Sequence, residues 1–169
     1  MVPAIVAAAA AVLGLVLGRY WDSHAEARRW RRDQRIRIYE SFASAYYASR
    51  EAYRSAALLE PGTSAKEEAA TKALDLGVDF NRTLIALWLH GSAQVALAAH
   101  ELDIEMNKLY AEVRTRQFTW PAWRTRRASA ERALERFTEA VRAELGLPRI
   151  AVEVHIDDLV LEPTAAGPS

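Results

Sequence analysis

The seventeen residues from Val2 to Gly18 carry no charge, and this run limits the possible folds more than any other feature of the chain. Its side chains are those of Ala, Val, Leu and Ile, with two Gly and one Pro. As a helix the run would be about 25 Å long, at the short end of what crosses a bilayer. Tyr20 and Trp21 follow where interfacial aromatic residues belong. The sequence therefore predicts a transmembrane anchor over residues 1–20.

Basic residues gather directly after this run. Between residues 19 and 37 they outnumber the three acidic residues, and they are Arg19, Arg28, Arg29, Arg31, Arg32, Arg35 and Arg37. Because no basic side chain precedes the run, the positive-inside rule predicts a single-pass protein of the cell membrane with its C-terminal domain in the cytoplasm. Residues 21–35 would form a basic stalk in contact with the lipid bilayer, each basic residue contributing about 1 kcal/mol near anionic lipid.

Two other interpretations of the run remain open. It could be a cleaved signal peptide, with Ala25-Glu26-Ala27 as the cleavage-like site. Against this stand the missing basic n-region, the length of the apolar run and the arginines on its exit side. It could also be a buried core helix, although nothing else in the chain is apolar all round. The anchor explains the pattern best.

Small residues recur every four positions inside the predicted anchor. Ala10, Gly14 and Gly18 share one helical face. Such faces let two backbones approach closely, and van der Waals contact then drives association in lipid. We therefore expect a homo-oligomer in which the anchor self-associates through these three residues.

Four apolar stripes with helical spacing follow the anchor, divided by turn-forming residues. The first runs from Ile38 to Leu59 and ends before Pro61-Gly62. No Gly or Pro occurs between Arg19 and Glu60, so the anchor and the first bundle helix should form one long helix. In the second stripe the residues expected to face inward are Ala69, Ala73, Leu76, Phe80, Leu84, Leu87 and Trp88.

Caps and breakers set the expected helix ends. Ser64 and Glu67 form a capping box at the start of the second helix, which should end near His90. Ser92 caps the third, and the fourth begins around Thr119-Trp120-Pro121. Gly146-Leu147-Pro148 is a strong stop signal. Gly77 lies inside the second helix and indicates a kink or a close contact.

Stripes of similar length joined by short connections favour an all-α fold, with an antiparallel up-down four-helix bundle over residues 36–147. An extended coiled coil would not need turns at such regular intervals. Residues 148–169 form a C-terminal tail, in which apolar and polar residues alternate from Ile150 to Leu161 as in a strand. Whether that short segment pairs with the bundle, with another copy or with a partner is open.

Several of these residues bear a resemblance to known sequences. Trp30-Arg31-Arg32-Asp33-Gln34-Arg35 followed by Tyr39 and Phe42 resembles a group of small, functionally uncharacterised membrane-anchored helical proteins of high-GC Gram-positive bacteria. Gly91-Ser92 followed by Val95, Ala98 and Ala99 is similar to a turn and helix start in the same group. The resemblance implies a single-pass topology and a helical bundle over most of residues 1–147. It implies no activity and no functional residues.

Signatures of catalysis and metal binding are weak. The chain has no cysteine, which removes disulfides and thiolate chemistry. His100-Glu101 begins like a zinc-protease helix, but position 104 is Ile, so the second ligand is missing. His155 with Asp157 and Asp158 could hold a cation weakly, or could simply be a solvated face. We predict no cofactor, no bound metal and no enzymatic activity, although an enzyme with an unrecognised site remains a third hypothesis.

The connection between the third and fourth helices is the one surface that suggests a function. Arg114, Arg116, Arg124, Arg126 and Arg127 cluster there, interleaved with Phe118, Trp120 and Trp123. The last three arginines lie in the first two turns of the fourth helix, where the helix dipole disfavours cations. Either this tip is a binding surface, or Trp123 closes the end of the bundle and the arginines are merely solvated.

These features lead to one function hypothesis with an alternative. The chain would be a membrane-tethered interaction module that presents the bundle tip to an unknown cytoplasmic protein partner. In the alternative it would tether nucleic acid, with the arginines contacting phosphates and the tryptophans stacking on bases. Equal numbers of basic and acidic residues, 22 each, mean that any steering of a polyanion would have to be local.

Overall fold

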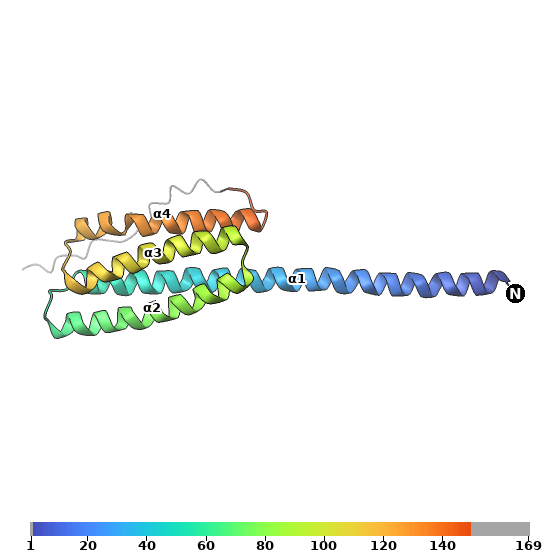
Figure 1. Ribbon diagram of the computed structural model, residues 1–169, viewed down its shortest axis with the longest axis horizontal. Helices are drawn as coiled ribbons and strands as arrows, with labels where there is room; N and C mark the ends of the chain where they lie inside the picture. The colour runs from blue at the N-terminus through green and yellow to red at the C-terminus, as the bar shows by residue number, and fades with distance from the viewer. Residues whose placement is uncertain (1, 150–169) are drawn as a thin grey trace, which may run out of the picture.

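The computed structural model describes the backbone of residues 2–149 and the side chains of residues 26, 29, 30 and 32–149. It contains four helices: α1 (Val2–Ala57), α2 (Ser64–His90), α3 (Ala93–Thr115) and α4 (Trp120–Glu144). Successive helices run in opposite directions, and the N-terminal part of α1 projects far beyond the other three (Figure 1). The protein is an all-α up-down four-helix bundle, as the stripes predicted, and no strand occurs within residues 2–149.

Hydroxyl side chains begin three of the helices. The N-caps are Thr63, Ser92 and Thr119, and each side-chain oxygen accepts a hydrogen bond from the backbone three residues further on. The cap at Ser92 and the start of α4 at Trp120 confirm the predictions. The one predicted at Ser64 is wrong by one residue, because Thr63 takes the extended cap conformation and Ser64 is already helical.

The C-terminal ends follow backbone chemistry. Gly146 has a φ of +69°, and the amides of Gly146 and Leu147 donate to the carbonyls of Ala143 and Arg142. This is a Schellman motif, so the stop signal at residues 146–148 is confirmed. The first helix ends at Ala57, three residues before Glu60. Its last two carbonyls, of Ala56 and Ala57, accept hydrogen bonds from Lys66 and from the amide of Phe118.

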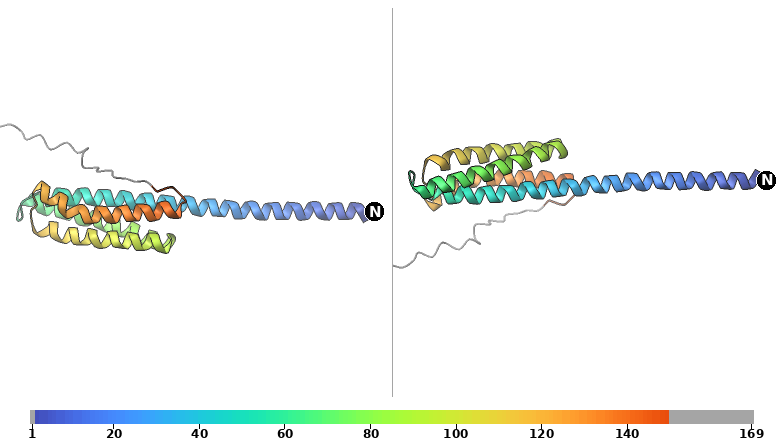
Figure 2. Two further views of the ribbon diagram at one scale, coloured as in Figure 1. Left: turned by 90° about the horizontal axis from the view of Figure 1, so that it is seen from above. Right: turned by 90° about the horizontal axis from the view of Figure 1, so that it is seen from below.

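Aromatic rings fill the centre of the bundle. The ring of Phe42 lies 4.8 Å from that of Phe80 and 4.9 Å from that of Phe137, measured between centroids. Each of these side chains is at most 3% exposed. Because α1, α2 and α4 each supply one ring, this cluster joins three helices. Contacts are most extensive within the pairs α1–α2 and α3–α4, and the two views of Figure 2 show how the pairs pack into one bundle.

The predicted stripes supply most of the core, with one clear error. Trp88 was expected inside but is 49% exposed. Its neighbour Leu87 takes the core position and is fully buried, and one step along a helix turns the side chain by about 100°. Gly77 marks a close contact as expected, since a Cβ there would come 3.3 Å from the hydroxyl of Tyr53.

The predictions for the two ends of the sequence concern residues that the structure does not describe in full. Among the residues whose side chains the structure describes, no helix is long and apolar enough to cross a membrane. The predicted anchor, residues 1–20 with Ala10, Gly14 and Gly18, lies outside the described side chains. The strand-like segment from Ile150 to Leu161 lies outside the described residues altogether.

Candidate functional site

The distal tip is the end of the bundle away from the N-terminus of α1. Here the connection between α3 and α4 (residues 116–119) lies beside the connection between α1 and α2 (Figure 1). The backbone amide of Phe118 donates to the carbonyl of Ala57 at 2.8 Å, and Nε2 of Gln117 donates to that of Leu58 at 2.9 Å. The tip is therefore held by hydrogen bonds to the end of α1.

A buried lysine joins three helices at the tip. Nζ of Lys66, in the first turn of α2, donates to the carbonyl of Ala56 and, at 3.0 Å, to that of Arg116. These carbonyls belong to the C-terminal ends of α1 and α3, where the helix dipole favours a cation. The side chain is only 3% exposed, and burial lowers the pKa of its ammonium. Lys66 thus serves as a structural cap.

Tryptophan closes the tip from inside. Trp123 is fully buried, and its ring meets that of Phe118 edge-on at 6.3 Å. Trp120 is half-buried beneath the guanidinium of Arg127, 5.8 Å from the ring centroid. The burial of Trp123 supports the interpretation that it closes the end of the bundle.

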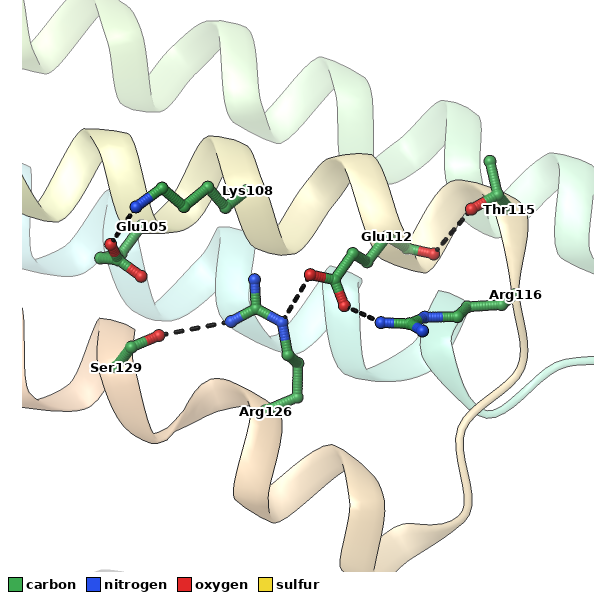
Figure 3. Close-up of polar contacts among 7 residues, drawn as sticks. All are labelled: Glu105, Lys108, Glu112, Thr115, Arg116, Arg126 and Ser129. Carbon is green, nitrogen blue, oxygen red and sulfur yellow. Dashed lines mark hydrogen bonds and ion pairs between the residues drawn. The ribbon is translucent and has the colours of Figure 1, made fainter.

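Two of the clustered arginines converge on one carboxylate from α3 (Figure 3). Nε of Arg126 lies 2.7 Å from Oε1 of Glu112, and Arg116 donates to Oε2 of the same residue. Burial raises the pKa of Glu112, but the hydrogen bonds from Arg126 and Arg116 outweigh burial and hold this pKa below its usual value. Glu112 therefore stays ionised, and its single negative charge leaves the group of Arg116, Arg126 and Glu112 with a net charge of +1.

Ser129 extends this network along α4. Its Oγ accepts from Nη1 of Arg126 at 3.3 Å, and its hydroxyl donates to Glu105. Hydrogen bonds from Lys108 and Ser129 lower the pKa of Glu105. Figure 3 shows Arg126 of α4 between Ser129 of the same helix and Glu112 of α3, and these contacts fix the register of α3 against α4.

Arg127 points into the bundle. It is 4% exposed, and its Nε lies 3.1 Å from Oε1 of Glu131, one turn further along α4. Arg50 of α1 lies 3.8 Å from the same carboxylate oxygen. Burial lowers the pKa of Arg127, and the neighbouring Glu131 opposes this effect. Glu112 and Glu131 thus offset the unfavourable placement of cations at the start of α4.

An open basic groove remains on the outer side of the tip. It has a volume of about 730 Å³ and is lined by Arg116, Gln117, Phe118, Thr119, Ala122, Thr125, Arg126, Ser129 and Arg132. Arg116 also lies over the ring of Phe118, 4.8 Å from its centroid. Arginine forks and hydroxyls at one site can bind carboxylate or phosphate oxygens. We call this site the tip groove.

The structure therefore divides the five arginines predicted as one cluster. Arg116 and Arg126 line the tip groove, and Arg127 lies in the bundle interior. Arg124 is exposed on α4, and Arg114 lies over the ring of Tyr110, 5.6 Å from its centroid.

Sequence reasoning missed part of the groove. Thr125, Ser129 and Arg132 were not singled out, although together with Ala122 and Arg126 they recur every three or four residues along α4. That spacing places them on one helical face and could have revealed them.

A second polar cluster lies at the opposite, proximal end of the bundle. Glu144, at the end of α4, accepts from Arg35 at 2.7 Å, from the hydroxyl of Tyr39 at 2.9 Å and from the amide of Ser92 at 3.4 Å. Burial raises its pKa, but these hydrogen bonds outweigh burial and the net shift is downward. Burial and the bond to Glu144 raise the pKa of Tyr39 to about 12. This cluster ties α4 to α1 where the bundle begins.

The histidines are dispersed. His100 contacts the ring of Trp88, with 5.9 Å between centroids, and His90 is exposed at the end of α2. Within the described residues, no group of three His, Asp or Glu side chains is placed to hold a metal ion. His155, Asp157 and Asp158 lie outside those residues.

Comparison with known proteins adds no relative. The scan against family models finds no match, and neither the curated proteins nor the solved structures give a significant one. The function has to be inferred from the geometry of the tip and of α1.

Proposed function

We propose that this chain is a membrane-tethered interaction module whose tip groove binds an acidic segment of a cytoplasmic protein. One observation carries the proposal: α1 is a single helix of 56 residues that enters the bundle only near Arg35. Residues 2–34 therefore precede the bundle, and at 1.5 Å per residue they extend about 50 Å. The apolar run is at one end of α1, and the tip groove lies at the far end of the bundle into which α1 continues.

The helical stalk determines how the bundle would be oriented relative to the membrane. If residues 2–18 cross the bilayer, residues 19–34 form a helical spacer of about 24 Å that carries arginines at the level of the lipid headgroups. Because α1 continues unbroken into the core, the bundle would stand upright on the membrane with its tip groove outermost. A partner that approaches through the cytoplasm would meet the groove first.

The chemistry of the groove favours an acidic protein segment. Arg116, Arg126 and Arg132 provide planar forks for carboxylates, and Thr125 and Ser129 provide hydroxyl contacts. Nucleic-acid binding with stacking is less well supported, because Trp123 is fully buried and Trp120 is half-buried under Arg127. Stacking on bases needs an exposed aromatic face.

The proposal is tested by capturing partners with full-length tagged protein in gentle detergent, followed by mass spectrometry. The test variant carries Arg132→Glu, which reverses a charge in the groove. The control carries Lys72→Glu, the same reversal on the exposed surface of α2, outside the groove. We expect wild type and control to recover the same acidic partner, and the groove variant to lose it.

Two results would contradict the proposal. Equal recovery by all three proteins would exclude the groove as the docking site. Loss of the captured material after nuclease treatment, with steep weakening between low and physiological salt, would instead indicate the nucleic-acid alternative. Fractionation of the same cells tests the tether, because the protein should sediment with membranes.

A further inference from the structure

α2 carries a second apolar stripe in addition to the one that faces the core. Its side chains are between 49% and 74% exposed, and they are Leu74, Val78, Ile85, Trp88 and Leu89. Their spacings of four, seven and three or four residues place them on one helical face. Each lies one or two positions away from a core residue such as Ala73 or Leu87, so the stripe lies beside the core face and not within it.

α3 continues the same surface. Leu97 and Ile104 are 61% and 40% exposed and lie two turns apart. Trp88 of α2 touches His100 of α3, which bridges the two helices. We call these seven apolar side chains, five from α2 and two from α3, the α2–α3 face. They form an apolar surface parallel to the bundle axis.

The α2–α3 face is larger than a monomer needs. Seven large apolar side chains at these exposures present on the order of several hundred Å², a patch size that usually marks an interaction site. A standard interface buries roughly 800 Å² on each partner, and in homodimers about 65% of that area is apolar. The face is therefore of the size that a dimer requires.

The charged side chains that border the face are paired. Arg82 lies one turn from both Val78 and Ile85. On α3, Glu101 lies one turn from both Leu97 and Ile104, and it pairs with Arg136 of α4 at 3.0 Å. Asp79 and Arg82 pair with each other at 2.8 Å. An isologous contact brings each residue close to its own copy, so a charged face would repel itself and a neutral one does not.

We propose that the α2–α3 face binds the same face of a second copy, giving a parallel dimer about a two-fold axis along the bundle. This inference rests on the proposed function, because two chains tethered in one bilayer share one orientation. Because the face runs along the bundle axis, each residue of one copy would lie beside the same residue of the other, for example Ile85 beside Ile85. Tethering also raises the effective concentration of one copy around another, which favours a contact of moderate size. The contact is separate from the one predicted within the anchor.

Disulfide cross-linking in native membranes tests this contact, since the chain has no cysteine of its own. Ile85→Cys places one thiol at the centre of the α2–α3 face. Glu135→Cys is the matched control, because residue 135 is exposed on α4 and reports only chance collisions in the membrane. Under mild oxidation we expect at least tenfold more cross-linked dimer from Ile85→Cys than from Glu135→Cys.

A second variant keeps the test independent of folding. Adding Val78→Glu to Ile85→Cys places two like charges in the contact and should cut cross-linking at least tenfold, while the melting of the helices stays unchanged. Equal cross-linking of Ile85→Cys and the control would overturn the dimer, as would a product that joins the chain to a different protein.

Fractionation separates the failure of the dimer from the failure of the membrane tether. Membrane-bound protein without the cross-link defeats the dimer alone, whereas cross-linked protein in the soluble fraction defeats the tether.

Discussion

At the scale of single residues, the three phenylalanines at the centre should dominate stability. Phe80 and Phe137 both contact Phe42 and are at most 3% exposed, so truncating either leaves a cavity among rings that cannot close around it. We expect Phe80→Ala and Phe137→Ala each to lower the free energy of unfolding by about 3–5 kcal/mol. Denaturant unfolding of the detergent-solubilised protein, followed by circular dichroism, measures this. A loss below about 1 kcal/mol for both variants would refute the core assignment.

Glu144 makes stability depend on pH at the same scale. Its pKa is lowered in the folded protein, so it contributes stability above its unfolded pKa of about 4.5 and loses this contribution as pH falls through its folded pKa. Glu144→Gln should lower the free energy of unfolding by about 1–3 kcal/mol at neutral pH, because charge-assisted bonds from Arg35 and Tyr39 are weakened. The gap between wild type and variant should shrink below pH 4.5. A gap that is constant from pH 7 to pH 3 would contradict the ionised role of Glu144.

At the scale of helices, the start of α4 gives a result that the sequence alone would not predict. Taken as solvated charges at a helix N-terminus, Arg124, Arg126 and Arg127 should be replaceable by Glu without loss of stability. The structure reverses this expectation for two of them, because Arg126 bonds to Glu112 of α3 and Arg127 is buried beside Glu131. Placing Glu at position 127 would put two carboxylates together inside the bundle.

We therefore expect Arg127→Glu to lower the free energy of unfolding by about 3 kcal/mol or more, as when a buried ion pair is broken. Arg126→Glu should cost about 1 kcal/mol or more, since its side chain is 24% exposed. Arg132→Glu, in the groove, should change stability by less than about 0.5 kcal/mol. Thermal melts of the three variants side by side distinguish them. Three melting temperatures equal to that of the wild type would mean that neither the pair of Arg126 with Glu112 nor that of Arg127 with Glu131 contributes to stability.

The sequence predicts the features that lie within one helix better than the contacts between helices. Helix number, direction and most ends followed from caps and stripes, because these signals are local. The pairing of Arg127 with Glu131 lies within one turn of α4 and could have been predicted from the spacing of four, but the burial of Arg127 could not. The bonds from Arg126 to Glu112 and from Lys66 to Arg116 could not, because they depend on the register between helices. Trp88 was misplaced because two apolar stripes meet there, and periodicity alone does not tell which of them is the core.

At the scale of the whole molecule, the anchor should bring copies together as well as hold them in the membrane. Ala10, Gly14 and Gly18 recur every four residues of the apolar run. Replacing Gly14 and Gly18 by Ile should weaken association in a membrane two-hybrid assay of the isolated anchor, because the two backbones could no longer approach. Replacing Leu13 and Leu15 by Ile, away from these positions, is the control and should change little. An unchanged signal for the Gly variant would show that the glycines play no part in association.

The membrane topology decides whether the bundle at the end of α1 lies in the cytoplasm, as we propose. The basic segment after the apolar run should keep the bundle in the cytoplasm. A C-terminal reporter that works only in the cytoplasm should therefore give a signal. A reporter that works only outside the cytoplasm should give none. Replacing Arg28, Arg29, Arg31 and Arg32 by Ser should make orientation mixed, because it removes most of the charge bias. The replacement also removes one exposed hydrogen bond of the bundle, from Arg32 to the carbonyl of Leu145. Activity of the external reporter in the wild type, or a mature N-terminus near Arg28, would defeat the anchor and with it the membrane tether. Retained cytoplasmic orientation after the Ser replacements would leave the anchor in place but show that these arginines do not set its direction.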